Sequence, residues 1–136
     1  MADILLDITV IQDGIAGDKA ALDILRQVMN QTITASVSPI TIAELWSDTN
    51  IDRKSEIRYT GIINFLKEAP LTLDACKTAG LWLASLNDVK ERQYYEHFAL
   101  IGASAKERDE PICTRNAADY SRFHVNTISY SSLTNL

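Results

Sequence analysis

The apolar residues of this sequence fall into short continuous runs and into longer segments with a helical spacing. The first run, residues 3–11, is broken by a single acid at Asp7. A near-continuous apolar run predicts a central strand that is buried on both faces, as in a parallel sheet covered by helices. Shorter runs that are rich in β-branched residues or bounded by turn signals predict four further strands, at residues 32–37, 70–73, 111–114 and 125–128.

Helical spacing predicts helices between these strands. Asp18 suits the N-cap of a helix over residues 19–28, and Ser38 with Pro39 suits the start of a second helix that runs to Trp46. Three further helices are predicted. The first has a buried stripe of Tyr59, Ile62, Ile63 and Leu66, and the second has an apolar seam of Ala75, Ala79, Trp82, Leu86 and Val89. The third runs from about Tyr95 to Lys106. The alternation of strands and helices predicts an α/β fold with a parallel sheet of about five strands.

Composition narrows the possible classes of protein. The chain has 136 residues, so we expect one domain over residues 1–136. Its 13 basic and 18 acidic residues give a net charge of −5, which disfavours coating of nucleic acid by bulk charge but not local contact with RNA. No apolar run approaches the ~18 residues of a membrane span, and the acidic N-terminus does not fit a signal peptide. With only Cys76 and Cys113, we expect a cytoplasmic protein without membrane contact.

Acidic or amide side chains follow three of the predicted strands. Asp7 interrupts the first strand where it should end, Glu44 lies beyond the second, and Asn116 and Asp119 follow the fourth. The binding crevice of an open parallel sheet lies outside the carboxyl ends of its strands, so these groups are expected at one edge. Each of them alone also fits a helix cap, a helix-dipole contact or a solvated acid. Together, oxygen ligands without histidine or thiolate suit Mg²⁺ or Mn²⁺, which activate water for phosphodiester hydrolysis.

Four segments of the chain carry an ordered set of motifs. Residues 5–11 are Leu-Leu-Asp-Ile-Thr-Val-Ile, and residues 38–45 are Ser-Pro-Ile-Thr-Ile-Ala-Glu-Leu. Residues 99–105 are Ala-Leu-Ile-Gly-Ala-Ser-Ala, and residues 114–120 are Thr-Arg-Asn-Ala-Ala-Asp-Tyr. In this order and spacing they resemble the motifs of the PIN-domain family, most closely its small VapC-type toxins. The last segment is similar to a family pattern that reads Thr-Arg-Asn/Asp-x-x-Asp-Phe.

The resemblance implies a three-layer α/β/α sandwich with a central parallel sheet, and hydrolysis of RNA that depends on Mg²⁺ or Mn²⁺. It also implies a small antitoxin protein as a partner and a homodimer. Matched by position, Asp7, Glu44, Asn116 and Asp119 fall on the acidic pocket of the family, in which Asp7, Glu44 and Asp119 would hold the metal.

One departure from the family pattern concerns the acid that precedes the Ala-Leu-Ile segment, because Phe98 stands at that position. Phe98 fits a core stripe with Ile101, Gly102 and Ala105. Glu96 is a candidate replacement as a metal ligand. Two residues turn a helix by about 200°, so this replacement requires Glu96 to precede the regular helix.

Supporting roles are expected for Thr9 and Thr114, through their hydroxyl groups, and for Arg115, as a phosphate contact or a structural ion pair. The basic residues Arg53, Lys54 and Arg58 fit either an RNA-facing patch or an ordinary solvated helix face.

Three functional hypotheses follow. The first is a metal-dependent endoribonuclease of the VapC toxin class. The second is a catalytically impaired module of the same fold that binds RNA or a protein partner, and the substitution of an acid by Phe98 motivates it. The third is an unrelated α/β protein in which the motifs are coincidental.

Overall fold

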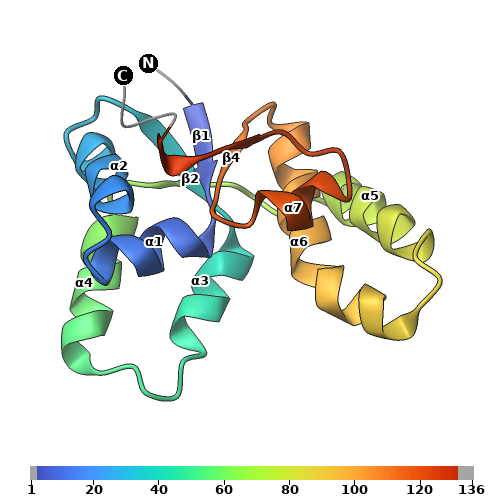
Figure 1. Cartoon of the computed structure of the whole chain (residues 1–136), viewed down its shortest axis with the longest axis horizontal. Helices are drawn as coiled ribbons and strands as arrows, with labels where there is room; N and C mark the ends of the chain where they lie inside the picture. Colours follow the sequence, from blue (N-terminus) through green and yellow to red (C-terminus); the bar gives the residue numbers. More distant parts are fainter. Residues whose placement is uncertain (1–2, 132–136) are drawn as a thin grey trace.

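The computed structural model describes residues 3–131, in which five parallel strands form one sheet (Figure 1). The strands are β1 (Asp3–Leu6), β2 (Thr34–Val37), β3 (Lys67–Glu68), β4 (Ile112–Cys113) and β5 (Thr127–Ile128). Their order across the sheet is β3-β2-β1-β4-β5, and every neighbouring pair is parallel. The predicted α/β class with a central parallel sheet is therefore confirmed.

Helices cover both faces of the sheet. Within residues 3–131 they are α1 (Ile8–Ile15), α2 (Lys19–Met29), α3 (Pro39–Trp46), α4 (Arg53–Ile63), α5 (Leu73–Ala84), α6 (Val89–Glu107) and α7 (Ala117–Ser121). Side chains alternate along β1, so Ile4 and Leu6 pack in a core with α1, α2 and α4, whereas Leu5 packs in a second core with α5, α6 and α7. Figure 1 shows these two groups of helices on opposite sides of the strands. The three-layer α/β/α sandwich is thus confirmed.

The first predicted strand is too long. β1 ends at Leu6, and Asp7 is the N-cap of α1, with its side chain accepting a hydrogen bond from the backbone N–H of Thr9. The predicted strand over residues 3–11 was therefore wrong beyond Leu6. Val10 and Ile11 are fully buried on α1, and a short apolar run does not distinguish a buried helix from a buried strand.

Two further predictions need correction. The third strand is Lys67–Glu68 and not residues 70–73, since Thr72 caps α5 and Leu73 begins it. The seam assigned to one long helix spans two: α5 ends at Ala84, and Val89, with 58% of its surface exposed, begins α6, six residues before the predicted start.

Several local predictions are confirmed. Asp18 caps α2 through the backbone N–H of Ala21, and Ser38 caps α3, in which Pro39 is the first residue. On α4 only Ile62 of the expected stripe is buried. None of the helices within residues 3–131 combines the length and the apolar character needed to span a membrane.

Candidate functional site

The candidate site lies where the order of the strands reverses, between β1 and β4. β1 has β2 on one side and β4 on the other, although β4 comes much later in the chain. Side chains that follow β1 and β4 therefore meet outside the carboxyl ends of these strands, where open α/β sheets bind ligands. Asp7 follows β1 and Thr114 follows β4, and the two side chains are hydrogen-bonded.

Asp7 accepts hydrogen bonds at both of its carboxyl oxygens. Oδ2 accepts from the hydroxyl of Thr9 at 2.8 Å, from the hydroxyl of Thr114 at 2.9 Å and from the backbone N–H of Thr9 at 3.3 Å. Oδ1 accepts from the hydroxyl of Tyr120 at 2.6 Å. Only 1% of the Asp7 surface is exposed, so this carboxyl group is buried and well supplied with donors.

The two threonines connect Asp7 to the loop between β4 and α7. The hydroxyl oxygen of Thr9 accepts from the backbone N–H of Arg115 at 3.1 Å, and that of Thr114 accepts from the backbone N–H of Asn116 at 2.8 Å. Each hydroxyl therefore donates its proton to Asp7 and uses a lone pair to hold the loop. The supporting hydroxyl role expected of Thr9 and Thr114 corresponds to these contacts with Asp7.

Tyr120 was not singled out from the sequence, although it is central to the site. It is fully buried, and its hydroxyl is bonded to Asp7. Burial raises the pKa of its phenol well above the ordinary value, and the charges of Asp7, Glu44 and Asp119 raise it further, so the group remains a neutral donor. The signal was the last residue of the fourth motif, where the family pattern has Phe and this chain has Tyr.

The hydroxyl of Tyr120 is bonded to Asp7, and the charges of Glu44 and Asp119 also act on its phenol, so the three acids belong to the same region of the molecule. We call this arrangement the acidic pocket. Burial raises the pKa of Glu44 above its ordinary value; the charge of His97 opposes this rise and the charge of Asp7 adds to it. The Oε1 atom of Glu44 is buried without a hydrogen-bond partner.

The other predicted ligands are more exposed than Asp7. Asp119 is half-buried, and its Oδ1 accepts from the hydroxyl of Tyr94 at 3.1 Å. Asn116 is the N-cap residue of α7 but makes no side-chain cap bond. Glu96 lies inside α6 with an exposed side chain, so it does not precede the regular helix as the replacement role required.

Phe98 belongs to an aromatic cluster beside the acidic pocket. It is 5% exposed, and its ring packs edge-on against Tyr120 with centroids 5.1 Å apart. The rings of Tyr94, Tyr95 and His97 also contact it, at centroid distances of 5.7, 6.2 and 3.9 Å. The core role predicted for Phe98 is confirmed, and the position of the family acid is filled by apolar rings.

As they lie, these residues do not fit a divalent metal ion. No group of three or more His, Cys, Asp or Glu side chains within residues 3–131 is placed to hold one. Asp7, the most buried of the acids, accepts three hydrogen bonds at Oδ2 and one at Oδ1, so its remaining capacity for a metal ion is at Oδ1 alone. Mg²⁺ and Mn²⁺ require several oxygen ligands with free lone pairs converging on one point.

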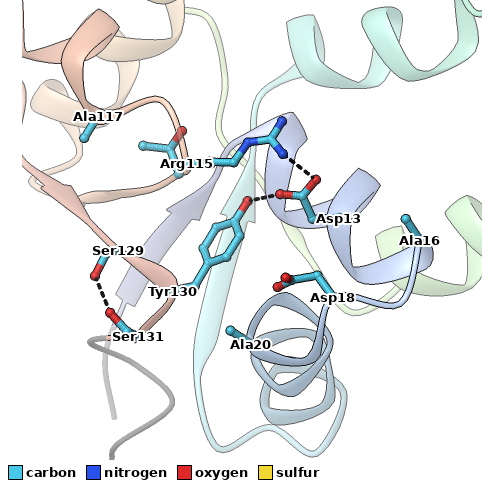
Figure 2. A pocket seen from close by; sticks show the side chains of 10 residues that line it. Asp13, Ala16, Asp18, Ala20, Arg115, Ala117, Ser129, Tyr130 and Ser131 are labelled. Carbon is cyan, nitrogen blue, oxygen red and sulfur yellow. Dashed lines mark hydrogen bonds and ion pairs between the residues drawn. The ribbon is translucent and has the colours of Figure 1, made fainter.

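Within residues 3–131, none of the basic side chains predicted for the site donates a hydrogen bond to the side chain of Asp7. Arg53, Lys54 and Arg58 are exposed on α4. Arg115 forms an ion pair with Asp13 of α1 at 3.1 Å, and the hydroxyl of Tyr130 donates to the other oxygen of Asp13 at 3.0 Å (Figure 2). Of the two roles expected for Arg115, these contacts correspond to the structural ion pair. Arg115, Asp13 and Tyr130 line a cavity of about 620 Å³.

Comparison with known proteins shows which solved structures share this fold. No protein-family model matches the sequence. No curated protein matches it either. Among solved structures, VapBC2 from Rickettsia felis, bound to a DNA fragment from its promoter, has a TM-score of 0.72 at 14% identity, covering 93% of this chain and 98% of that chain.

Two other structures agree with this result. DNA-bound VapBC from Salmonella typhimurium has a TM-score of 0.68 at 19% identity, covering 96% of this chain and 99% of that one. A toxin–antitoxin complex from Klebsiella pneumoniae has a TM-score of 0.64 at 20% identity, covering 92% and 96%. At such identities the likeness concerns the fold: this chain has the PIN-type fold of VapC toxins, as its motifs indicate, and the hypothesis of an unrelated fold is excluded.

Proposed function

We propose that this chain is a toxin-type protein that acts by binding a small antitoxin-type protein, without metal-dependent hydrolysis of RNA. The neighbours in fold were solved as VapBC, FitAB or toxin–antitoxin complexes, and they match over most of both chains. The proposal is the second of the hypotheses drawn from the sequence, with a protein as the partner. The poor fit of the acidic pocket to a metal ion favours it over the first.

The observation that carries the proposal is an apolar groove between α1, α2 and α4. It has a volume of about 560 Å³, and we define it by its apolar lining: Ile15, Leu22, Leu25, Met29, Ile62 and Phe65. Phe65, just beyond α4, is 47% exposed although it is large and apolar. Apolar surface that is concave and open to solvent is typical of a protein-binding site.

The groove fits one kind of occupant best. Three helices border it, and an amphipathic helix can place apolar side chains at i, i+3 or i+4, and i+7 into such a groove. Arg58 lies at the groove and is exposed, so an acidic residue on the partner would be favoured opposite it. We therefore expect the antitoxin-type partner to present an apolar helical face with an acidic edge.

Phe65→Glu should weaken binding of this partner at least tenfold, because it places a charge in the apolar groove. Leu81→Glu is the matched control: Leu81 is 74% exposed but lies on α5, on the other side of the sheet. The partner is captured on the wild-type chain, identified, produced separately and titrated against all three proteins. Equal affinity for wild type and Phe65→Glu, or a loss only with Leu81→Glu, would contradict the proposed groove.

The metal-dependent ribonuclease is the second candidate, and one observation favours it. The unpartnered Oε1 of Glu44 is a buried acceptor beside Asp7, and a buried acceptor without a donor is costly unless something satisfies it. RNA cleavage as a function of Mn²⁺ concentration separates the two candidates.

Homodimerisation, which the resemblance implies, stays a prediction. Large apolar side chains are exposed on α5 at Leu73 and Leu81, in the helix layer opposite the apolar groove. A second copy that docks on α5 would leave the groove free for the antitoxin-type partner.

A further inference from the structure

Three of the five glycines in the chain are explained by packing or conformation within the chain itself. A Cβ at Gly14 would collide with the side chain of Leu25, and one at Gly102 would lie 2.9 Å from Cγ2 of Val125. Gly17 has a φ of 98°, a conformation that other residues rarely adopt. A larger residue at any of these three positions would disturb the free chain.

Gly61 and Gly80 have no such explanation. A Cβ at either position would meet no heavy atom within 4 Å, and neither residue has a positive φ. Gly61 lies in α4 and is not its C-cap, which is Asn64, and Gly80 lies in α5. Glycine destabilises a helix relative to alanine, and one of its uses is to let another group approach the backbone closely. Nothing in the free chain makes that approach at these two positions.

The surroundings of the two glycines differ. Gly61 lines the apolar groove, whereas Gly80 lies on α5, in the other helix layer. Arg58, Gly61 and Ile62 are spaced i, i+3 and i+4 on α4, Phe65 follows at i+7 just beyond the helix, and all four line the groove. In paired helices, four residues with this spacing form a hole that accepts one side chain of the facing helix. We call these four residues the α4 hole.

The α4 hole is large, apolar and bordered by one charge. The absence of a side chain at Gly61 enlarges it at one corner, and Phe65 is 47% exposed, so apolar surface beside it is uncovered. Large apolar side chains of α2 line the same groove: Leu22, Leu25 and Met29. Among the described residues that line the groove, only Arg58 is charged. A bulky apolar side chain with an acidic neighbour on its own helix therefore complements the hole in size and in charge.

We propose that the α4 hole receives one bulky apolar side chain from a helix of the antitoxin-type partner, and that Gly61 sets the size of the side chain that fits. This inference rests on the proposed function, because it concerns the same groove. It adds a residue that determines specificity, since a partner helix with a small residue at this point would leave the hole unfilled.

Gly61→Ala and Gly61→Leu fill the hole from the side of this chain. The partner, isolated on the wild-type chain and produced separately, is titrated calorimetrically against each variant. We expect Gly61→Ala to weaken binding at least about fivefold and Gly61→Leu at least about fiftyfold, because the added side chain takes the space of the partner's side chain. Gly80→Ala and Gly80→Leu are the matched controls and should bind within about twofold of wild type.

Thermal unfolding of the free chain gives a readout of the opposite sign. Gly61→Ala and Gly80→Ala should both raise the melting temperature by roughly 1–4 °C, because alanine loses less conformational freedom than glycine in a helix. A Gly61→Ala chain that is more stable alone and binds the partner less well separates a lost partner contact from damage to the fold.

Alanine substitutions along the partner helix identify the side chain that enters the hole. One substitution of a large apolar residue there should remove the difference between wild type and Gly61→Ala, leaving their affinities within about twofold of each other. Additive effects at every partner position would contradict a direct contact with Gly61.

Three further results would overturn the proposal. One is unchanged affinity in Gly61→Leu while Phe65→Glu weakens binding, which leaves the proposed function standing. Another is a Gly61→Ala chain that is less stable than wild type while Gly80→Ala is more stable, because the fold itself would then require Gly61. The third is a change in the oligomeric state of the chain alone in Gly61→Leu, which would assign the hole to a second copy. The absence of any partner, or a partner whose affinity Phe65→Glu leaves unchanged, overturns the proposed function and this inference together.

Discussion

Asp7→Ala is expected to lower the free energy of unfolding by about 3–5 kcal/mol. The substitution leaves three buried hydroxyl donors without their acceptor, those of Thr9, Thr114 and Tyr120. It also removes the N-cap of α1. Both threonines hold the loop between β4 and α7, so the loss should spread to the packing of α7. Urea-induced unfolding followed by circular dichroism measures the change.

Asp13→Ala is the matched control for this loss. Asp13 also accepts two side-chain hydrogen bonds, from Arg115 and Tyr130, but it is partly exposed, so its removal should cost less than about 1 kcal/mol. An Asp7→Ala protein as stable as Asp13→Ala would contradict the structural role of Asp7.

Glu44→Gln should not lower the free energy of unfolding, in contrast to Asp7→Ala. The pKa of Glu44 is raised in the fold, so its ionised form opposes folding above the ordinary value near 4.5, and this penalty disappears as pH falls through the raised value. At pH 7 the neutral glutamine should leave stability unchanged or slightly higher.

Phe98→Asp is expected to destabilise the fold by more than about 4 kcal/mol, close to the whole stability of many domains of this size. It removes the ring contacts with Tyr94, Tyr95 and Tyr120 and puts a carboxylate at a position that is 5% exposed. Restoring the acid of the family pattern therefore does not by itself restore a metal site.

Phe98→Leu keeps an apolar side chain and should cost less than about 1.5 kcal/mol, which separates the effect of the charge from that of altered packing. Urea midpoints of the two variants and wild type at pH 7 measure both effects. A Phe98→Asp protein that unfolds within about 1 kcal/mol of wild type would show that this position tolerates an acid.

Local signals in the sequence predicted the parts of the fold that depend on neighbouring residues. The caps at Asp18 and Ser38 are hydrogen bonds over two or three residues, so their residue types and spacing are visible in the sequence. β3 was misplaced because it is a two-residue polar strand at the edge of the sheet, with neither an apolar run nor alternation to mark it. The length of β1 was wrong because its apolar run continues into a buried helix.

The composition of the acidic pocket was harder to predict than its location. Strand order brings Asp7 and Thr114 together beyond the carboxyl ends of β1 and β4, the edge that the sequence indicated. The contacts that decide its chemistry join Asp7 to Thr114 and Tyr120, which are 107 and 113 residues away. The spacing of nearby residues does not predict such long-range contacts. The only sign of them in the sequence is the Tyr at the end of the fourth motif, where the family pattern has Phe.

A calorimetric titration of the wild-type chain with Mn²⁺, with RNA cleavage assayed at the same concentrations, tests most directly whether the acidic pocket is a closed hydrogen-bonded site or a metal centre. We expect no saturable heat up to about 10 mM Mn²⁺, and no more cleavage than with Asp7→Asn. Binding of one Mn²⁺ per chain with a submillimolar Kd, together with cleavage of RNA, both abolished in Asp7→Asn, would contradict this expectation and establish the nuclease.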